Sequence, residues 1–569
     1  MAKPLKFLYL ICRKGGIGEK GHDSPRDCMI RRIATVGGLT LISRLTGFLR
    51  DVVMAAVLGA GPLADAFFVA FRLPNHFRAI FAEGAFAAAF VPAYARTLQQ
   101  AGLPAAKLFA DQIGAALITI NLVVLAIAMI FTPEVVSVLA PGLDPMRFDL
   151  AVALTRITFP YLALVSIETL FAGILNANNR FAAAAGAPIL LNLSIVATLL
   201  LTPYFQDAGH AAAWGVLLAG VAIVLVVGGD AEAHGVGIRF RMPRLDEPTR
   251  KFLKALGPAI IGAGGVQLAL FADTLIASYL PTGALSALYY ADRINQLPIG
   301  VVGIAVGTVL LPEMSRRLAA GDERGAASAQ ARGIQLVLLL TIPCAVSAIV
   351  VPDLIMRALF ARGAFTAENA AAAGATLAAY SFGLLPFVLL RSFTAPFYAR
   401  GDTATPVKAA LLAAGINVLL KILLMGHLAQ VGLAAATSVG AWINLSLLAF
   451  FARRQGFAVS GTAIGRPVVM LALSGAILGA ALVAGTYGLE RALAHMAYFR
   501  EETVLAILIV WGILVYGGAV LALLGQKWFM SLLRDVGAAA DTKGPALLPA
   551  PDPTDDSAAL PDSEPPPRV

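Results

Sequence analysis

SRLTGFLRDVVMAAVLGAGPLADAFFVAFRLPNHFRAIFAEGAF, residues Ser43–Phe86, is the stretch on which the interpretation of the whole chain depends. On either side of Gly59–Gly61 it is apolar for long enough to predict two membrane helices joined at those glycines. Charged side chains nevertheless stand inside both helices, and each costs roughly 2.5–3.5 kcal/mol at the middle of a bilayer. Such residues usually face protein or water and mark functional sites. The stretch therefore predicts a helix pair that lines a positively charged cavity.

The composition is that of a membrane protein with many spans. Of the 569 residues, 59% are hydrophobic and only 14% are charged, whereas about a quarter are charged in soluble domains. The formal charge of +9 lies in short loops between apolar runs, and no basic-aromatic motif accompanies it, so nucleic acid is not expected as a partner. The cysteines and histidines lack metal-ligand spacing, and the sequence contains no motif for nucleotide binding or hydrolysis. We expect a transporter without metal or cofactor rather than an enzyme.

Apolar runs of about 20 residues, the length that crosses a bilayer, predict an all-α fold with fourteen spans. The expected arrangement is two six-helix lobes around a central cavity, followed by two further helices. The segments are an N-terminal extension at 1–28 that is disordered or a misassigned start, an N-lobe at 29–229, a linker at 230–250, a C-lobe at 251–453, two last spans at 454–530 and a disordered tail at 531–569. Lysine and arginine concentrate in every second loop, which predicts that the linker and both termini are cytoplasmic.

A short internal echo supports the division into two lobes. FFVAFRLPN at Phe67–Asn75 resembles LYYADRINQLP at Leu288–Pro298. The arginine of each copy, Arg72 or Arg293, is followed about 20 residues later by a proline and a basic loop. Together with the polar break after the sixth expected span, the echo predicts an internal repeat, a common feature of transporters.

The arginines of the opening stretch suggest an anionic ligand. Arg50 stands beside Asp51 and can form a local pair, whereas Arg44 and Arg78 have no acidic residue near them in the sequence. A guanidinium group stays charged and offers a bidentate fork to phosphate or carboxylate. Other arginines fit equally well as side chains that extend to the membrane interface; these are Arg72, Arg96 and Arg156.

Four segments carry a resemblance to a known family: SRLTGFLRD, ADAFFVAFRLPN, FRAIFAEGAF and YYADRINQLPIGVVGIAVGTVLLP. Over residues 29–530 the chain resembles the MurJ (MviN) family of lipid II flippases, within the MATE-like flippase superfamily. The resemblance implies a multi-pass protein of the bacterial inner membrane, with a V-shaped cationic cavity and a C-terminal groove for an undecaprenyl tail. The implied substrate is undecaprenyl-pyrophosphate-linked GlcNAc-MurNAc-pentapeptide, moved from the cytoplasmic to the periplasmic leaflet. The implied partners are membrane lipids and the cell-wall synthesis machinery.

The resemblance also assigns residues. Those implied to bind substrate are Arg44, Arg50, Asp65, Asn75, Arg78 and Arg293. Those implied to form gates or to support the structure are Asp51, Glu83, Asp292 and Arg391. Within these sets, we expect Arg44, Arg78 and Arg293 to bind the pyrophosphate, and Glu83 to pair with Arg391 in a periplasmic gate.

One position departs from a sodium site found in some members of the family. Asp273, Asn417 and Thr437 match that site, but Lys421 stands where those members have a second carboxylate. Asn417 and Lys421 share a helix face at i,i+4. The Lys421 ammonium can take the place of the cation beside Asp273, which predicts that sodium does not bind there. Lys421 extending to a membrane interface is an equally good interpretation of the sequence.

Three other functions compete with lipid II transport. A flippase for another lipid-linked oligosaccharide would share the helix count. A MATE-type antiporter for cationic drugs would need an acidic cavity, and this one is expected to be basic. A scaffold without transport activity would have little reason to keep broken, charged membrane helices.

Overall fold

The computed structural model describes residues 25–77, 86–239, 247–457, 461–496 and 498–532. In these ranges the regular structure is helical. The helices of the first half are α2 (Pro25–Leu58), α3 (Pro62–Phe77), α4 (Ala87–Ile130), α5 (Thr132–Leu139), α6 (Pro145–Ala177), α7 (Ala182–Leu200), η2 (Thr202–Tyr204) and α8 (Ala208–Ala233). Those of the second half are α9 (Glu247–Ser278), α10 (Ala284–Pro298), η3 (Ile299–Gly303), α11 (Ile304–Ala319), α12 (Glu323–Val350), α13 (Pro352–Phe360), α14 (Ala367–Phe382), α15 (Leu384–Ala399), α16 (Ala404–Arg454), α17 (Gly461–Ala492) and α18 (Arg500–Leu524).

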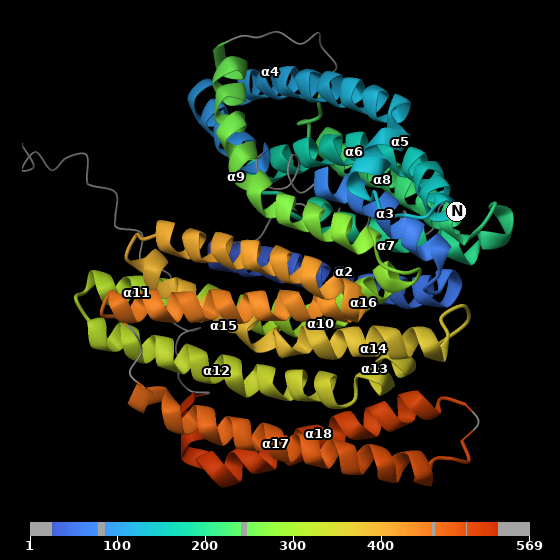
Figure 1. Cartoon of the computed structure of the whole chain (residues 1–569). Helices are drawn as coiled ribbons and strands as arrows, with labels where there is room; N and C mark the ends of the chain where they lie inside the picture. Colours follow the sequence, from blue (N-terminus) through green and yellow to red (C-terminus); the bar gives the residue numbers. More distant parts are fainter. Residues whose placement is uncertain (1–24, 78–85, 240–246, 458–460, 497, 533–569) are drawn as a thin grey trace, which may run out of the picture.

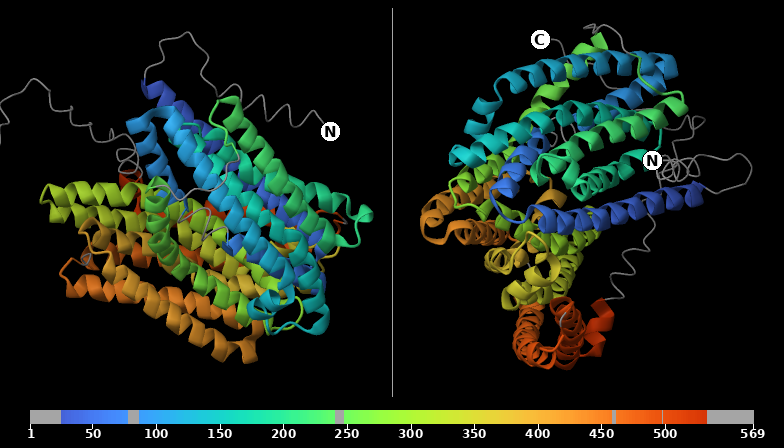
Figure 2. Two further views of the ribbon diagram at one scale, coloured as in Figure 1. Left: turned by 90° about the horizontal axis from the view of Figure 1, so that it is seen from above. Right: turned by 90° about the vertical axis from the view of Figure 1, so that its right-hand side faces the viewer.

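The helices form two groups and an appended hairpin (Figure 1). Helices α3 to α8 make up one group, and α10 to α16 make up the other. The α17–α18 hairpin lies on the side of the second group that faces away from the first (Figures 1 and 2). Helix α2 packs against α7, and α9 contacts both α4 and α16. We refer to the two groups as the N-lobe, with α2, and the C-lobe.

Nine helices within the described ranges are long and apolar enough to cross a membrane. Helices α2, α3 and α10 are not among them. Helix α2 carries arginine and aspartate inside its apolar run, and α3 and α10 have only 16 and 15 residues. Helix α10 continues directly through a π-helical turn, η3, into α11, so the three form one continuous helical segment.

Two long helices contain the breaks that separate expected spans. Helix α4 is interrupted at Gly102, whose φ of 77° is non-helical, between the spans expected at about 63–94 and 108–131. Helix α16 is interrupted at Ala429, between the spans expected at about 404–426 and 431–452. At other boundaries the helices extend beyond the expected limits. Helix α2 begins at Pro25, inside the expected extension 1–28, and α8 and α9 reach into the expected linker 230–250.

The largest apolar core crosses the boundary between the lobes. It joins N-lobe residues such as Met54 and Phe67 to C-lobe residues such as Leu285, Tyr290 and Phe365. All five side chains are at most 2% exposed. Continuous burial of this kind excludes water, so the lobes are in firm contact at one end of the molecule.

Candidate functional site

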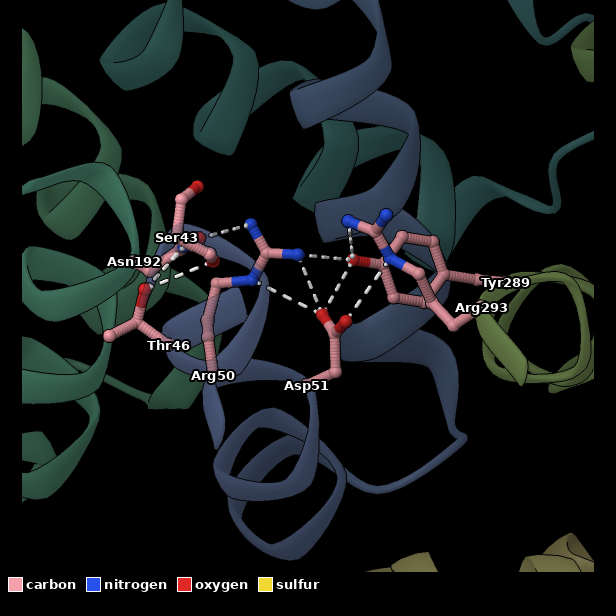
Figure 3. A network of polar contacts seen from close by, with 7 residues as sticks. All are labelled: Ser43, Thr46, Arg50, Asp51, Asn192, Tyr289 and Arg293. Atoms are coloured by element: carbon pink, nitrogen blue, oxygen red, sulfur yellow. Dashed lines mark hydrogen bonds and ion pairs between the residues drawn. The ribbon is translucent and has the colours of Figure 1, made fainter. Parts of the chain in front are cut away.

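Arg50 and Asp51, adjacent on α2, are the centre of a buried polar network at the lobe boundary (Figure 3). Each is 4% exposed. The Arg50 guanidinium donates through Nη2 to Asp51 Oδ1 at 2.7 Å and through Nε at 3.1 Å. Burial of such a pair is tolerated when further hydrogen bonds satisfy the remaining donors and acceptors, and neighbouring helices supply these bonds.

Helix α10 of the C-lobe supplies Tyr289 and Arg293. The Tyr289 hydroxyl accepts from Arg50 Nη2 at 3.1 Å and donates to Asp51 Oδ1 at 3.0 Å. Arg293 Nε lies 3.1 Å from Asp51 Oδ2, and its Nη2 donates to the Tyr289 hydroxyl at 3.4 Å. The Arg293 side chain is 37% exposed. One carboxylate therefore faces two guanidinium groups, one from each lobe, and the second retains access to solvent.

Helix α7 contributes Asn192, which is 5% exposed. Its Oδ1 accepts from Arg50 Nη1 at 3.0 Å. Its Nδ2 donates to the Ser43 carbonyl at 3.1 Å and to Thr46 Oγ1 at 3.2 Å (Figure 3). The amide thus fixes the Arg50 guanidinium and holds α2 against α7 one to two turns before Arg50.

A cavity of about 350 Å³ opens beside this network. It is lined by Ser43, Arg44, Gly47, Phe48, Arg50, Asp51, Asn192, Arg293, Gln296, Leu297 and Gly300. Its charged lining is three arginines and one aspartate. Arg44 is exposed, reaches over the backbone of Gly300 in η3, and has no carboxylate partner among the described residues. The cavity is therefore suited to an anion, because its positive charge exceeds what the protein neutralises.

A second charged network crosses the lobe boundary near the C-terminal end of α2. Asp65, at 0% exposure, accepts from the backbone N–H groups of Gly283 at 2.7 Å and Ser286 at 2.9 Å, and from Ser286 Oγ at 2.6 Å. Arg147 Nη1 lies 3.4 Å from Asp65 Oδ2 and also donates to the Leu280 carbonyl at 3.3 Å. The carboxylate thus caps the N-terminus of α10 from the other lobe.

Arg147 is held in turn by Asp144, the N-cap residue of α6, with which its side chain forms an ion pair. Asp144 lies in the loop before the helix. Its pKa is lowered, first by the hydrogen bond from the Arg147 backbone N–H and then by the Arg147 side chain. The carboxylate therefore stays charged at neutral pH and keeps Arg147 oriented toward the lobe boundary.

Glycines allow the two backbones to meet beside Asp65. A Cβ on Gly363 would lie 2.3 Å from the Ala56 carbonyl oxygen, and one on Gly59 would lie 2.6 Å from the Ala364 carbonyl oxygen. Both glycines have positive φ. The Ala364 N–H donates to the Ala56 carbonyl at 2.8 Å. We call the contacts of Ala56–Asp65 and Arg147 with Leu280–Ser286 and Gly363–Ala364 the interlobe seal.

The expectation that Asp65 contacts substrate finds no support in this geometry. Its carboxylate is fully buried in the seal and does not line the cavity. Arg44, Arg50 and Arg293 do line the cavity, together with Asp51. The other expected residues are placed as follows. Asp292 accepts from Gln296, and Arg391 is exposed beside Gly303 and Gly307. Arg78, Glu83 and the Asn75 side chain lie outside the described residues, so the expected Glu83–Arg391 pair remains a prediction.

At the expected ion site, Lys421 forms an ion pair with Asp273 and is 2% exposed. The lysine therefore lies beside Asp273 in the interior rather than extending to an interface, and the absence of sodium binding remains a prediction. Asn417, one turn before Lys421 on α16, has a buried Oδ1 without a hydrogen-bond donor among the described residues. The Thr437 hydroxyl donates to the Leu433 carbonyl of its own helix.

Comparison with known proteins assigns the fold and the family. A family model described as "Lipid II flippase MurJ" matches residues 54–529. The probable lipid II flippase MurJ of Rhizobium tropici is 40% identical over 496 residues, covering 86% of this chain and 93% of the relative. That of Rhizobium meliloti strain 1021 is 45% identical over 428 residues, covering 74% and 80%. The chain belongs to the lipid II flippase MurJ family.

Solved structures agree at the level of the fold. A structure titled "Lipid II flippase MurJ, inward closed conformation" has a TM-score of 0.71 at 24% identity and covers 88% of this chain and 99% of its own. An inward-facing multidrug resistance MATE transporter has a TM-score of 0.58 at 14% identity, covering 74% and 97%. The chain is therefore a multi-pass, all-helical membrane protein with the MurJ fold, which MATE transporters share.

Proposed function

We propose that this chain carries lipid II, the undecaprenyl-pyrophosphate-linked GlcNAc-MurNAc-pentapeptide, from the cytoplasmic to the periplasmic leaflet of the inner membrane. Membership of the MurJ family supports the substrate. The observation that carries the mechanism is the arginine-rich cavity at the boundary of two lobes. A cavity in that position can be exposed to either side of the membrane when the lobes move relative to each other.

The headgroup contact is proposed from the charges of the cavity. Pyrophosphate is doubly anionic or more at neutral pH and pairs well with forked guanidinium groups. Arg44 is exposed and free of carboxylates in the described chain, and Arg293 is partly exposed. Both can contact a phosphate without first breaking a buried pair. We therefore assign these two arginines, with Arg78 by family pattern, to the pyrophosphate. Arg50 also lines the cavity and presents a further cation beside Arg293, and Asp51 holds both of these guanidinium groups in place.

The proposed topology has fourteen spans with both termini in the cytoplasm. This count divides α4 and α16 at their breaks, takes α3 and the part of α4 before Gly102 as one span, and joins α10 to α11 and α14 to α15. With the start of α2 on the cytoplasmic side, the interlobe seal lies toward the periplasm and the cavity faces the cytoplasm. The state is then ready to take substrate from the inner leaflet. Glu83 and Arg391 are proposed as a further periplasmic gate.

We propose no nucleotide site, so transport draws on an ion gradient, the membrane potential or the gradient of the substrate. Partners in cell-wall synthesis would consume the translocated substrate. A cationic drug as substrate is disfavoured by the arginine excess of the cavity, which repels cations.

Growth of a cell depleted of its own lipid II flippase tests the proposal. The full chain should restore growth and prevent lysis, whereas the Arg44→Ala, Arg293→Ala double variant should fail at equal expression. Arg454→Ala, which removes an exposed arginine at the end of α16, is the matched control and should restore growth. Growth with the double variant would contradict the assigned headgroup contact, and no rescue by the unaltered chain would contradict the transport function.

A further inference from the structure

The Tyr289 hydroxyl is a neutral group that contacts Arg50, Asp51 and Arg293 at once. It accepts from Arg50 Nη2 at 3.1 Å and from Arg293 Nη2 at 3.4 Å, and it donates to Asp51 Oδ1 at 3.0 Å. A phenol has one donor hydrogen and two acceptor lone pairs. All of its hydrogen-bonding capacity is therefore used between the two guanidinium groups and their shared carboxylate.

The aromatic ring fixes where that oxygen lies. The Tyr289 ring stacks on Phe68 of α3, with 4.0 Å between centroids and 23° between planes. The next residue, Tyr290, packs against it edge-on at 5.4 Å. Stacked aromatic rings have few alternative orientations in a packed core. The hydroxyl is thus a rigid neutral acceptor carried by the C-lobe and pressed against the N-lobe.

Without this acceptor, Arg293 would depend on Asp51 alone. Arg50 is held independently by Asn192, but Arg293 has Asp51 and the Tyr289 hydroxyl as its polar partners in the described chain. Its side chain is 37% exposed, so solvent would compete for it. Two like charges also repel each other when no shared acceptor lies between them. The separation of the two guanidinium groups therefore depends on the tyrosine oxygen.

We propose that Tyr289 is a positioning residue that sets the spacing of Arg50 and Arg293 for an anion with two linked phosphates. Tyr289 does not line the cavity, so it acts through the arginines rather than by touching the ligand. The inference rests on the proposed function and deepens it, because it concerns how the same site tells a diphosphate from a single phosphate. A fixed pair of cations favours a ligand that reaches both of them at once.

The test compares Tyr289→Phe with Tyr290→Phe in the full chain, purified in lipid nanodiscs. The control residue, the neighbouring tyrosine on α10, is buried, and its hydroxyl donates to the Gly59 carbonyl at 3.4 Å. Binding of inorganic pyrophosphate and of inorganic phosphate is measured by calorimetry. Tyr289→Phe should lower the affinity for pyrophosphate about tenfold, which is the scale of one hydrogen bond to a charged group. It should lower the affinity for phosphate by less than about twofold. Tyr290→Phe should change neither affinity.

Coupling to Arg293 separates positioning from general stability. In an Arg293→Ala background, Tyr289→Phe should change pyrophosphate affinity by less than about twofold, because the spacing no longer exists. The inference would be overturned if Tyr289→Phe kept wild-type affinity for pyrophosphate, or if it lowered the affinities for pyrophosphate and phosphate equally. The proposed function would still stand in both cases if the Arg44→Ala, Arg293→Ala double variant abolished binding. Absence of pyrophosphate binding by the unaltered chain would overturn both.

Discussion

The cavity network and the interlobe seal are built from the same residue types and lie on the same lobe boundary. They differ in how much charge remains without a protein partner. In the seal, Asp65 is 0% exposed and accepts three hydrogen bonds from Gly283, the N-cap residue of α10, and from Ser286, in addition to its ion pair with Arg147. In the cavity, Asp51 is shared by two arginines, and Arg44 adds a third positive charge. The seal is saturated and dry, whereas the cavity keeps positive charge open to solvent.

The number of partners that a charged side chain already has therefore distinguishes structural charges from ligand-binding charges better than burial or a sequence motif alone. A saturated buried pair has no capacity for a ligand, and removing one partner leaves the other uncompensated. An exposed arginine without a carboxylate contributes little to stability and can bind an anion at small cost. Substitutions in the seal should therefore affect stability first, and substitutions in the cavity should affect binding first.

Asp65→Ala should be the most destabilising change. It leaves the Gly283 and Ser286 N–H groups without their acceptor in a buried interface, and it leaves Arg147 with only the Leu280 carbonyl and Asp144 as partners in the described chain. Breaking a buried charge pair costs about 3–5 kcal/mol, so thermal unfolding of the purified protein should shift strongly downward. Asp149→Ala, an exposed aspartate on α6, should change the free energy of unfolding by less than about 0.5 kcal/mol. Equal melting temperatures for the two variants would show that Asp65 contributes no more to stability than an exposed surface residue.

Gly363→Ala should come next, with Gly235→Ala as its matched control. Both glycines have similar positive φ, 59° and 68°. A Cβ on Gly363 would meet the Ala56 carbonyl oxygen at 2.3 Å, whereas one on Gly235 would meet no atom within 4 Å. The control should lose about 1–2 kcal/mol from backbone strain alone. Overlap with the opposite backbone should cost a further 1–3 kcal/mol at Gly363, measured as the difference in melting between the two variants.

Arg44→Ala should leave stability within about 0.5 kcal/mol of wild type, because the side chain is exposed and has no carboxylate partner in the described chain. Pyrophosphate affinity should nevertheless fall at least tenfold, since one of the three cavity arginines is lost. Calorimetry and thermal unfolding on the same preparation give both quantities. A large loss of stability with unchanged pyrophosphate affinity would show that Arg44 has a structural role, like the residues of the seal, and does not bind the ligand.

The sequence predicted the helical membrane class and the arginines of the cavity because charge inside an apolar run is a strong signal. It could not separate Asp51 from Asp65, since the partners of Asp65 are distant in the chain and two of them are backbone N–H groups. For the same reason Arg147 gives no sequence signal of its structural role, although it is buried against Asp65. Asn192 gave no sequence signal, because a single amide in an apolar run is common in membrane helices.

Tyr289 could have been found from the internal echo. Phe68 and Tyr289 each stand four residues before the arginine of their copy, Arg72 or Arg293. In the structure these two equivalent residues stack on each other across the lobe boundary. Contact between equivalent positions is what an approximate two-fold relation between the lobes produces. This contact is what the expected repeat requires, and the repeat itself stays a prediction.

The smallest expected effect is that of sodium, which should be none. The Lys421 ammonium pairs with Asp273 and lies one turn from Asn417, so a positive charge already occupies the position beside the carboxylate. Melting in sodium chloride and in potassium chloride at equal ionic strength should therefore coincide. Lys421→Asp replaces that ammonium with a hard oxygen ligand next to Asp273 and the unpartnered Asn417 Oδ1, and it should acquire stabilisation specific to sodium. Sodium-specific stabilisation of the unaltered chain that disappears in Asp273→Ala would show that the lysine does not substitute for the cation. The cavity would then not be the only place where this protein leaves charge available to a ligand.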